Sequence, residues 1–207
     1  AALMAGGITR TADTELWNGS SWTEVNNLNA AREYFRGAGT TTAGIAFAGV
    51  TSDPTAVGLT ETWDGTNWTE VNDLNTARQK PGAAAAGTTT ASLAYGGSPG
   101  APETTVIANT ESWNGSTWTE VNDLNTARYG IAGAGIITSA IGIAGYTTTI
   151  VTNVETWDGS SWTEVAEFNT SRYVVGSTGH DNEAVIIFGG AAPSKVDNVE
   201  IWNGSSW

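Results

Sequence analysis

Residues 63–71 read Trp-Asp-Gly-Thr-Asn-Trp-Thr-Glu-Val, and the fold of the chain can be worked out from this segment. An Asp-Gly or Asn-Gly dipeptide between two β-favouring flanks is the strongest short hairpin signal, and we expect both central residues to take positive φ there. A two-residue loop would place the two Trp rings diagonally on one face of the hairpin, and a four-residue loop would place them directly opposite. The stretch therefore predicts an antiparallel hairpin that carries a pair of indoles.

The same pattern, W-[D/N]-G-[S/T]-[S/T/N]-W, occurs five times, at intervals of 46, 50, 44 and 45 residues. All ten tryptophans belong to these five pairs, and the two members of a pair are five positions apart: Trp17 and Trp22, Trp63 and Trp68, Trp113 and Trp118, Trp157 and Trp162, Trp202 and Trp207. A period of this length is typical of repeat architectures, in which each repeat is one supersecondary unit. The chain is thus predicted to consist of five units in series.

Two further kinds of stretch complete each unit. A short apolar run ending in Gly-Gly or Ala-Gly precedes each hairpin, at 3–7, 45–49, 93–97, 141–145 and 186–190. A run of small residues follows four of the hairpins, at 35–39, 82–87, 130–135 and 173–179. Four short strands in a unit of this length are typical of a β-propeller blade. We therefore predict an all-β fold, one propeller over residues 1–207 with four-stranded antiparallel blades at 1–28 (partial), 29–74, 75–124, 125–168 and 169–207.

The ten indoles are expected to be the largest packing contribution between blades. Burying one Trp side chain removes about 150–250 Å² of surface from water. Only 14% of the residues are charged, against about 25% in an average soluble domain. Few charges, 26 glycines and no long helical periodicity agree with an all-β protein that has many tight turns.

Charge and cysteine content exclude several classes of function. The net charge is −13 with only eight Lys and Arg residues, which argues against nucleic acid because those residues make the phosphate contacts. Without cysteines the chain has no disulfide, thiolate metal site or thiol nucleophile. No run of 18 apolar residues is present, so we expect no membrane insertion.

The number of strands of each kind in the five repeats indicates how a propeller ring would close. Five Gly-Gly or Ala-Gly strands and five Trp hairpins are present, but only four runs of small residues. We favour a segment of a longer chain, or of a larger ring, over a self-sufficient ring of five blades. A strand donated by a partner subunit is a third interpretation.

The order of these signals resembles the Kelch-type propeller repeat over essentially the whole chain: Gly-Gly, an acidic-aromatic strand, a Trp one hairpin later, then Arg. It departs from that pattern at Ala48-Gly49 and Ala144-Gly145, and the aromatic residue before Asp/Asn-Gly is always Trp. The sequence pattern E-[T/S]-W-[D/N]-G-[S/T]-x-W-T-E-V-N-D-L-N-T-A-R also resembles tandem repeats in predicted structural proteins of marine tailed phages. The second resemblance implies a virion or extracellular location.

No residue pattern indicates an enzyme. The lone histidine, His180, lies in a Gly-His-Asp-Asn-Glu stretch that we interpret as a polar turn and not as a base or metal ligand. Kelch-type copper oxidases use His, Tyr and a thioether-linked Cys, and this chain has one His and no Cys. We therefore predict no catalytic residue, no metal ligand and no cofactor.

Arginine recurs at one offset after each of the first four hairpins, and glutamate recurs two residues before the first Trp of each pair. These residues could form a polar binding ring or ion pairs within and between blades. Residues that recur in every unit are more typical of a structural role than of a single binding site, so we favour ion pairs. The arginines concerned are Arg32, Arg78, Arg128 and Arg172.

The loop between the Gly-Gly strand and the Glu-x-Trp strand differs most between repeats. These loops, at 8–12, 50–59, 98–109, 146–153 and 191–198, would share one face of the disc. Function usually sits in variable loops on a constant scaffold. The candidate binding residues are Asp53, Pro54, Pro99, Glu103, Tyr146, Pro193 and Lys195.

We expect a non-enzymatic structural or adhesion module, a component of a phage tail or fibre, that contacts a receptor or a neighbouring protein through these loops. The alternative is a carbohydrate-binding propeller lectin with repeated sites between blades, where exposed Trp faces stack on sugars. The expected partner is thus a protein or a cell-surface glycan. Self-association into a homo-oligomer or incorporation into a virion is compatible with either interpretation.

Overall fold

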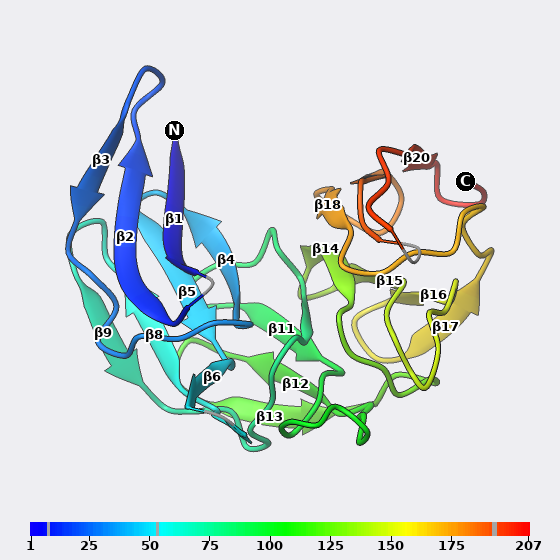
Figure 1. Ribbon diagram of the computed structural model, residues 1–207, viewed down its shortest axis with the longest axis horizontal. Coiled ribbons are helices and arrows are strands. Elements are labelled where there is room, and N and C mark those ends of the chain that lie inside the picture. The colour runs from blue at the N-terminus through cyan, green and yellow to red at the C-terminus, as the bar shows by residue number, and fades with distance from the viewer. Residues whose placement is uncertain (8, 53, 192–193) are drawn as a thin grey trace.

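The computed structural model describes residues 1–7, 9–52, 54–191 and 194–207. Its regular elements are all β-strands, which form five small antiparallel sheets arranged as a five-bladed β-propeller (Figure 1). This confirms the predicted all-β propeller. Among the described residues there is no helix that could cross a bilayer.

The three middle blades have four strands each, paired in chain order from the inside outward. Blade 2 contains β4 (Arg36–Thr40), β5 (Ala43–Phe47), β8 (Thr60–Trp63) and β9 (Trp68–Val71). Blade 3 contains β10 (Gly82–Ala83), β11 (Ser92–Tyr95), β12 (Thr110–Trp113) and β13 (Trp118–Val121). Blade 4 contains β14 (Ala132–Ile136), β15 (Ser139–Ile143), β16 (Val154–Trp157) and β17 (Trp162–Val165).

The first and last sheets have three strands each within the described residues. Blade 1 contains β1 (Ala2–Gly7), β2 (Thr11–Trp17) and β3 (Trp22–Val25), and blade 5 contains β18 (Gly176–Thr178), β19 (Val185–Phe188) and β20 (Val199–Trp202). A small extra ribbon, β6 (Val50–Ser52) with β7 (Thr55–Ala56), lies in the loop of blade 2. Figure 1 shows the blades in chain order along an arc, with blades 1 and 5 at its two ends.

The Trp hairpins have four-residue turns, so the two indoles of a pair lie directly opposite each other, as Trp63 and Trp68 do. In all five pairs the ring centroids are 5.3–5.6 Å apart and the rings are tilted. The expectation that both central residues take positive φ is wrong. Only the glycine does, at +97° in Gly65. Asp64 instead closes the turn with its side chain, whose Oδ1 accepts hydrogen bonds from the backbone N–H groups two and three residues later (2.8 and 2.7 Å).

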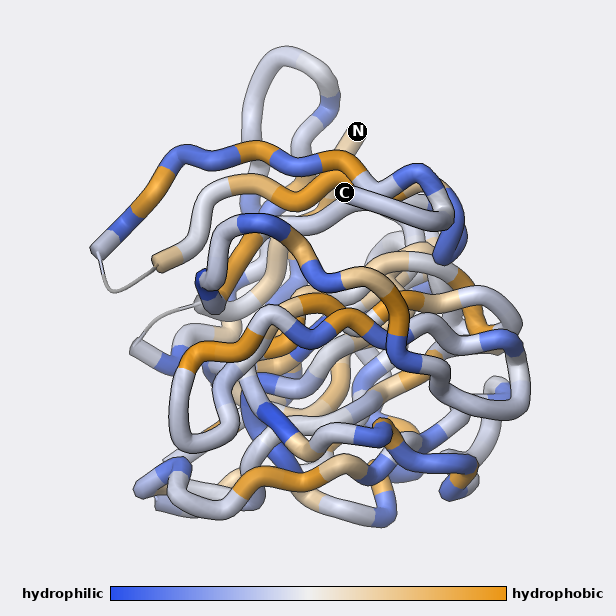
Figure 2. Tube along the Cα trace, turned by 90° about the vertical axis from the view of Figure 1, so that its right-hand side faces the viewer, coloured by the Kyte–Doolittle hydropathy of each residue, from blue (hydrophilic) through white to orange (hydrophobic). Residues whose placement is uncertain are grey.

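The indoles fill the space between neighbouring blades. Trp118 belongs to blade 3 but packs edge-on against Phe47 of blade 2, with ring centroids 5.0 Å apart. Its Nε1–H donates to Thr60 Oγ1 of the same neighbour at 3.0 Å. Since the second Trp of each pair faces the preceding blade, Trp22 of blade 1 stays 44% exposed. Figure 2 shows hydrophobic and hydrophilic stretches alternating along the Cα trace.

Candidate functional site

The repeated arginines lie at the junctions between blades. Arg78 follows the outer strand of blade 2, and its Nη2 donates to Glu111 Oε1 on β12 of blade 3 at 2.5 Å, with both side chains fully buried. The glutamate in each pair is the residue two positions before the first Trp of the next blade. The four pairs are Arg32–Glu61, Arg78–Glu111, Arg128–Glu155 and Arg172–Glu200.

An asparagine three residues before the arginine binds the other oxygen of the same carboxylate. Asn75 donates its backbone N–H (2.7 Å) and its Nδ2 (2.9 Å) to Glu111 Oε2, and Nδ2 also donates to the Trp118 carbonyl at 3.0 Å. Burial lowers the pKa of Arg78, and the charge of Glu111 opposes that shift. Because these charges are buried, paired and hydrogen-bonded, they form a clamp between blades and not an open binding site.

The connectors behind the clamps share a surface with the variable loops. The residue after each clamp arginine forms a β-bridge with a residue at or next to the start of the variable loop of the following blade, as Tyr129 does with Tyr146. We call this surface the loop face. It comprises the loops at 50–59, 98–109, 146–153 and 191–198 and the connectors at 33–35, 79–81, 129–131 and 173–175, as far as these are described.

One position in each connector has a left-handed backbone. The second residue after the clamp arginine has φ of +59° in Tyr34, +52° in Lys80, +67° in Gly130 and +53° in Val174. Backbone hydrogen bonds join successive connectors here, from Lys80 N–H to the Tyr34 carbonyl (2.8 Å) and from Gly130 N–H to the Lys80 carbonyl (2.9 Å). A non-glycine residue in such a conformation costs on the order of 1–3 kcal/mol, and this kind of strain clusters at functional sites.

Lys80 lies at the centre of a polar and aromatic cluster on the loop face. Its Nζ is 4.3 Å from the ring centroid of Tyr34 and 5.4 Å from that of Tyr129. The same Nζ is 2.6 Å from Glu103 Oε1, which comes from the variable loop of blade 3. Three connectors and one loop, far apart in the sequence, thus contribute to one group of side chains.

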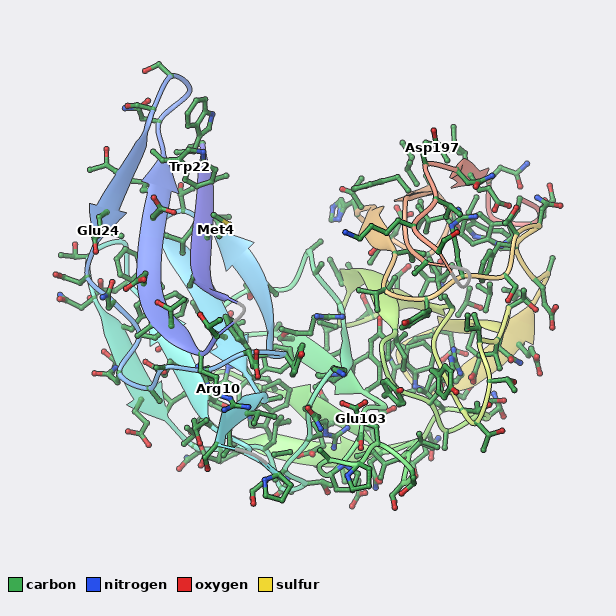
Figure 3. All side chains as sticks on the ribbon, in the orientation of Figure 1. Met4, Arg10, Trp22, Glu24, Glu103 and Asp197 are labelled. Carbon is green, nitrogen blue, oxygen red and sulfur yellow. The ribbon has the colours of Figure 1, made fainter. Side chains whose placement is uncertain are left out.

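Two more tyrosines extend the cluster. The ring centroids of Tyr129 and Tyr146 are 5.4 Å apart, and those of Tyr146 and Tyr173 are 6.1 Å apart. Partial burial, with Glu103 nearby, raises the pKa of Tyr129 to about 12, so its hydroxyl stays neutral. We call the whole set the tyrosine–lysine arc: Tyr34, Lys80, Glu103, Tyr129, Tyr146 and Tyr173. Glu103 is labelled in Figure 3.

The arc offers aromatic faces, one ammonium group, one carboxylate and tyrosine hydroxyls. Such a surface can stack on sugar rings or apolar side chains and hydrogen-bond to their polar edges. No group of three or more His, Cys, Asp or Glu side chains suited to a metal ion lies among the described residues. The arrangement therefore fits recognition of a ligand surface.

The predicted loop residues have different environments. Glu103 and Tyr146 belong to the arc, whereas Pro99 and Lys195 are exposed outside it. The Pro54 carbonyl accepts a hydrogen bond from Ala101 N–H at 2.9 Å, which joins the loops of blades 2 and 3. Asp53 and Pro193 lie outside the described residues.

Four members of the arc were missed from the sequence: Tyr34, Lys80, Tyr129 and Tyr173. They lie in the connectors, one or two residues after a clamp arginine. An aromatic or lysine residue recurs at that offset, and this recurrence is the sequence pattern from which they could have been predicted.

His180 lies apart from the arc. It sits between β18 and β19, at the opposite end of the strands from the connectors. Its side chain is exposed. Asp181 Oδ1 accepts backbone hydrogen bonds from Glu183 (2.9 Å) and Ala184 (3.2 Å), as in a polar turn.

No protein-family model matches this chain, and no curated protein matches it either. What the chain does is therefore inferred from its own residues. The loop face carries that inference because its side chains differ from blade to blade, while the Trp hairpins and clamps repeat.

Proposed function

We propose that this propeller is a non-enzymatic adhesion module that binds its partner through the loop face. The observation that supports the proposal is the tyrosine–lysine arc. Its members come from successive blades, and three of its connectors, at Tyr34, Lys80 and Val174, have strained left-handed backbones. Strain of this kind persists only where the surrounding structure holds it, which favours a surface kept in one shape for a ligand.

The biological setting is proposed from sequence resemblance. The repeat resembles tandem repeats in predicted structural proteins of marine tailed phages and, more broadly, the Kelch-type repeat. Both resemblances support a scaffold that presents loops, here on a tail or fibre. In that setting the loop face would contact a host receptor or a neighbouring virion protein.

Glycan binding is the second candidate function. Seven of the ten indoles are buried, with at most 7% of their surface exposed, so stacking of sugars on Trp faces between blades has little support. The tyrosine rings of the arc supply aromatic surface in their place, with Tyr34 42% exposed. A single glycan site on the loop face is thus favoured over repeated sites between blades.

The test compares matched variants in binding to a glycan array and to intact host cells. Tyr34→Ala and Lys80→Ala should each weaken binding about tenfold or more, because interface aromatic and charged anchors carry most of the binding energy. Glu24→Gln removes a charge from an exposed position on β3, outside the loop face, and should leave binding unchanged. Equal binding by all three variants would contradict the proposal. Binding to array glycans that is lost with Tyr34→Ala would favour the lectin.

A further inference from the structure

Lys80 and Glu103 form an ion pair on the loop face that solvent can reach. Lys80 lies in the connector behind the clamp of blades 2 and 3, and Glu103, labelled in Figure 3, lies in the variable loop of blade 3. Lys80 Nζ is 2.6 Å from Glu103 Oε1, and 22% and 24% of the two side chains are exposed. The pair is therefore an accessible polar centre within the arc that carries no net charge.

Each member of the pair has hydrogen-bonding capacity to spare. One of the three N–H groups of the Lys80 ammonium donates to Glu103. The described part of the chain supplies no acceptor for the other two. A carboxylate can accept about four hydrogen bonds, and Glu103 has Lys80 and the nearby Tyr129 hydroxyl as its donors. Free donors and free acceptor sites thus lie side by side, within reach of one ligand.

An ionic ligand gains little from this pair. An anion attracted by the Lys80 ammonium also meets the Glu103 carboxylate, only 2.6 Å away from it, and a cation meets the reverse. Because the Coulomb energy falls only as the inverse of the distance, the two charges largely cancel at the position of a ligand ion. A hydroxyl group avoids this cancellation, since its oxygen accepts from the ammonium while its hydrogen is donated to the carboxylate. The pair thus favours uncharged ligands that carry hydroxyl groups.

Two aromatic rings lie against the ion pair. The ring centroids of Tyr34 and Tyr129 are 4.3 and 5.4 Å from Lys80 Nζ. An apolar side chain of a protein partner could cover these rings, but it would bury the free donors and acceptors of the pair without partners, which is costly. A sugar ring satisfies both kinds of surface, because its C–H face packs on an aromatic face while its hydroxyls reach polar groups at the edge.

We propose that the Lys80–Glu103 pair is the hydroxyl-binding centre of the arc and that its ligand is an uncharged pyranose sugar of a glycan. One ring hydroxyl accepts a hydrogen bond from Lys80 Nζ, its neighbour on the ring donates to the Glu103 carboxylate, and the C–H face of the sugar lies on the Tyr34 ring. This role of the pair depends on the proposed binding function of the loop face. It fixes the chemical class of the ligand as neutral sugars, in preference to uronic acids and amino sugars.

The experiment measures which class of sugar the whole chain binds. Polymer-linked glucoside, galactoside and mannoside are displayed beside the matched uronate and 2-amino sugar of each, and bound protein is quantified over a concentration series. The unaltered chain should bind at least one neutral sugar about tenfold or more tightly than the uronate and the amino sugar of the same series, because only the neutral sugar meets no like charge.

Variants with one charge of the pair removed should change this preference in opposite directions. Glu103→Gln leaves Lys80 without its carboxylate and should raise the affinity for uronate relative to neutral sugar about tenfold or more, because charge-assisted hydrogen bonds are the stronger ones. Lys80→Gln should raise the relative affinity for the amino sugar for the converse reason. The double variant, with neither charge, should prefer neutral sugars again.

Ratios of affinity within one protein do not depend on the fraction of it that is folded, so they are decisive for a variant of reduced stability. The preference of the unaltered chain decides the matter where a variant fails to fold. Glu24→Gln is the matched control, because it removes one carboxylate from an exposed position on β3, outside the loop face, and should leave both ratios unchanged. A shift in this variant equal to that of Glu103→Gln would show a general effect of net charge and overturn the role of the pair.

Comparison with binding to intact host cells separates the sugar ligand from the adhesion function. Cell binding that falls with Tyr34→Ala, without binding to any displayed neutral sugar, would keep the adhesion function and overturn the sugar ligand. An absence of both cell binding and sugar binding would overturn both. An unaltered chain that prefers uronates or amino sugars, or unchanged ratios in Glu103→Gln and Lys80→Gln, would overturn the role of the pair alone.

Discussion

Arg78 and Glu111 lie fully buried at the junction of blades 2 and 3, with Nη2 and Oε1 2.5 Å apart. Each residue belongs to a different blade, so their contact ties one repeat to the next. The same contact recurs at the other three internal junctions. The clamp is therefore the polar counterpart of the Trp pairs in holding the blades together.

Breaking one clamp should destabilise the propeller strongly. Arg78→Met leaves Glu111 buried without its cation and should reduce the free energy of unfolding by about 3–5 kcal/mol. Replacing both partners, as Arg78→Met with Glu111→Leu, should restore much of that loss because no uncompensated charge remains. Urea unfolding followed by Trp fluorescence measures both. A single variant as stable as the parent chain would show that the clamp contributes nothing.

Buried and exposed Trp side chains should differ in how much they contribute to the free energy of unfolding. Trp118→Ala removes a buried ring packed on Phe47 and its hydrogen bond to Thr60, and should cost about 3–5 kcal/mol. Trp22→Ala removes an indole that is 44% exposed and should cost less than about 2 kcal/mol. Denaturant midpoints of the two variants test this, and equal losses would contradict the assigned packing.

Acid should weaken the Asp-type hairpin turns. Backbone N–H groups of Ser161 and Ser160 lower the pKa of Asp158 from 3.8 to about 2. A carboxyl whose folded pKa is depressed contributes stability above its unfolded pKa, and that contribution is lost as the pH falls from 3.8 towards 2. Asp158→Asn should flatten this part of the pH profile while keeping the turn, since asparagine occupies the same position in three other repeats. Thermal midpoints between pH 2 and 7 measure the difference, and identical profiles would refute it.

The titration of the Tyr129 hydroxyl at alkaline pH should depend on its neighbours in the arc. Its desolvation, together with the charge of Glu103, raises its pKa from 10.0 to about 12. Glu103→Gln should therefore lower the pKa of Tyr129, as followed by ultraviolet absorbance, with Tyr129→Phe assigning the signal. Because the unfolded chain releases this proton first, stability should fall as the pH rises from 10 towards 12. An unchanged titration in Glu103→Gln would separate Glu103 from the arc.

Much of the architecture follows from local patterns. The Trp-Asp/Asn-Gly spacing determines a hairpin, because only glycine adopts the required positive φ at low cost, and the two indoles on one face demand a neighbour to cover them. Ion pairs for the repeated arginines were also predicted from their recurrence. The turn type was missed, since an Asx side chain satisfies the backbone without a positive φ at Asp64.

The sequence by itself determined the strands, their number in each repeat and the indoles that the blades bury, because these depend on neighbours a few residues apart. The pairing of each arginine with its glutamate, and the meeting of Tyr34, Lys80 and Glu103 in one place, became visible from the arrangement of the blades. Those contacts join residues that are tens of positions apart, and their meeting depends on how successive blades rotate about a common axis. Blade rotation arises from packing across whole sheets, and no short pattern encodes it.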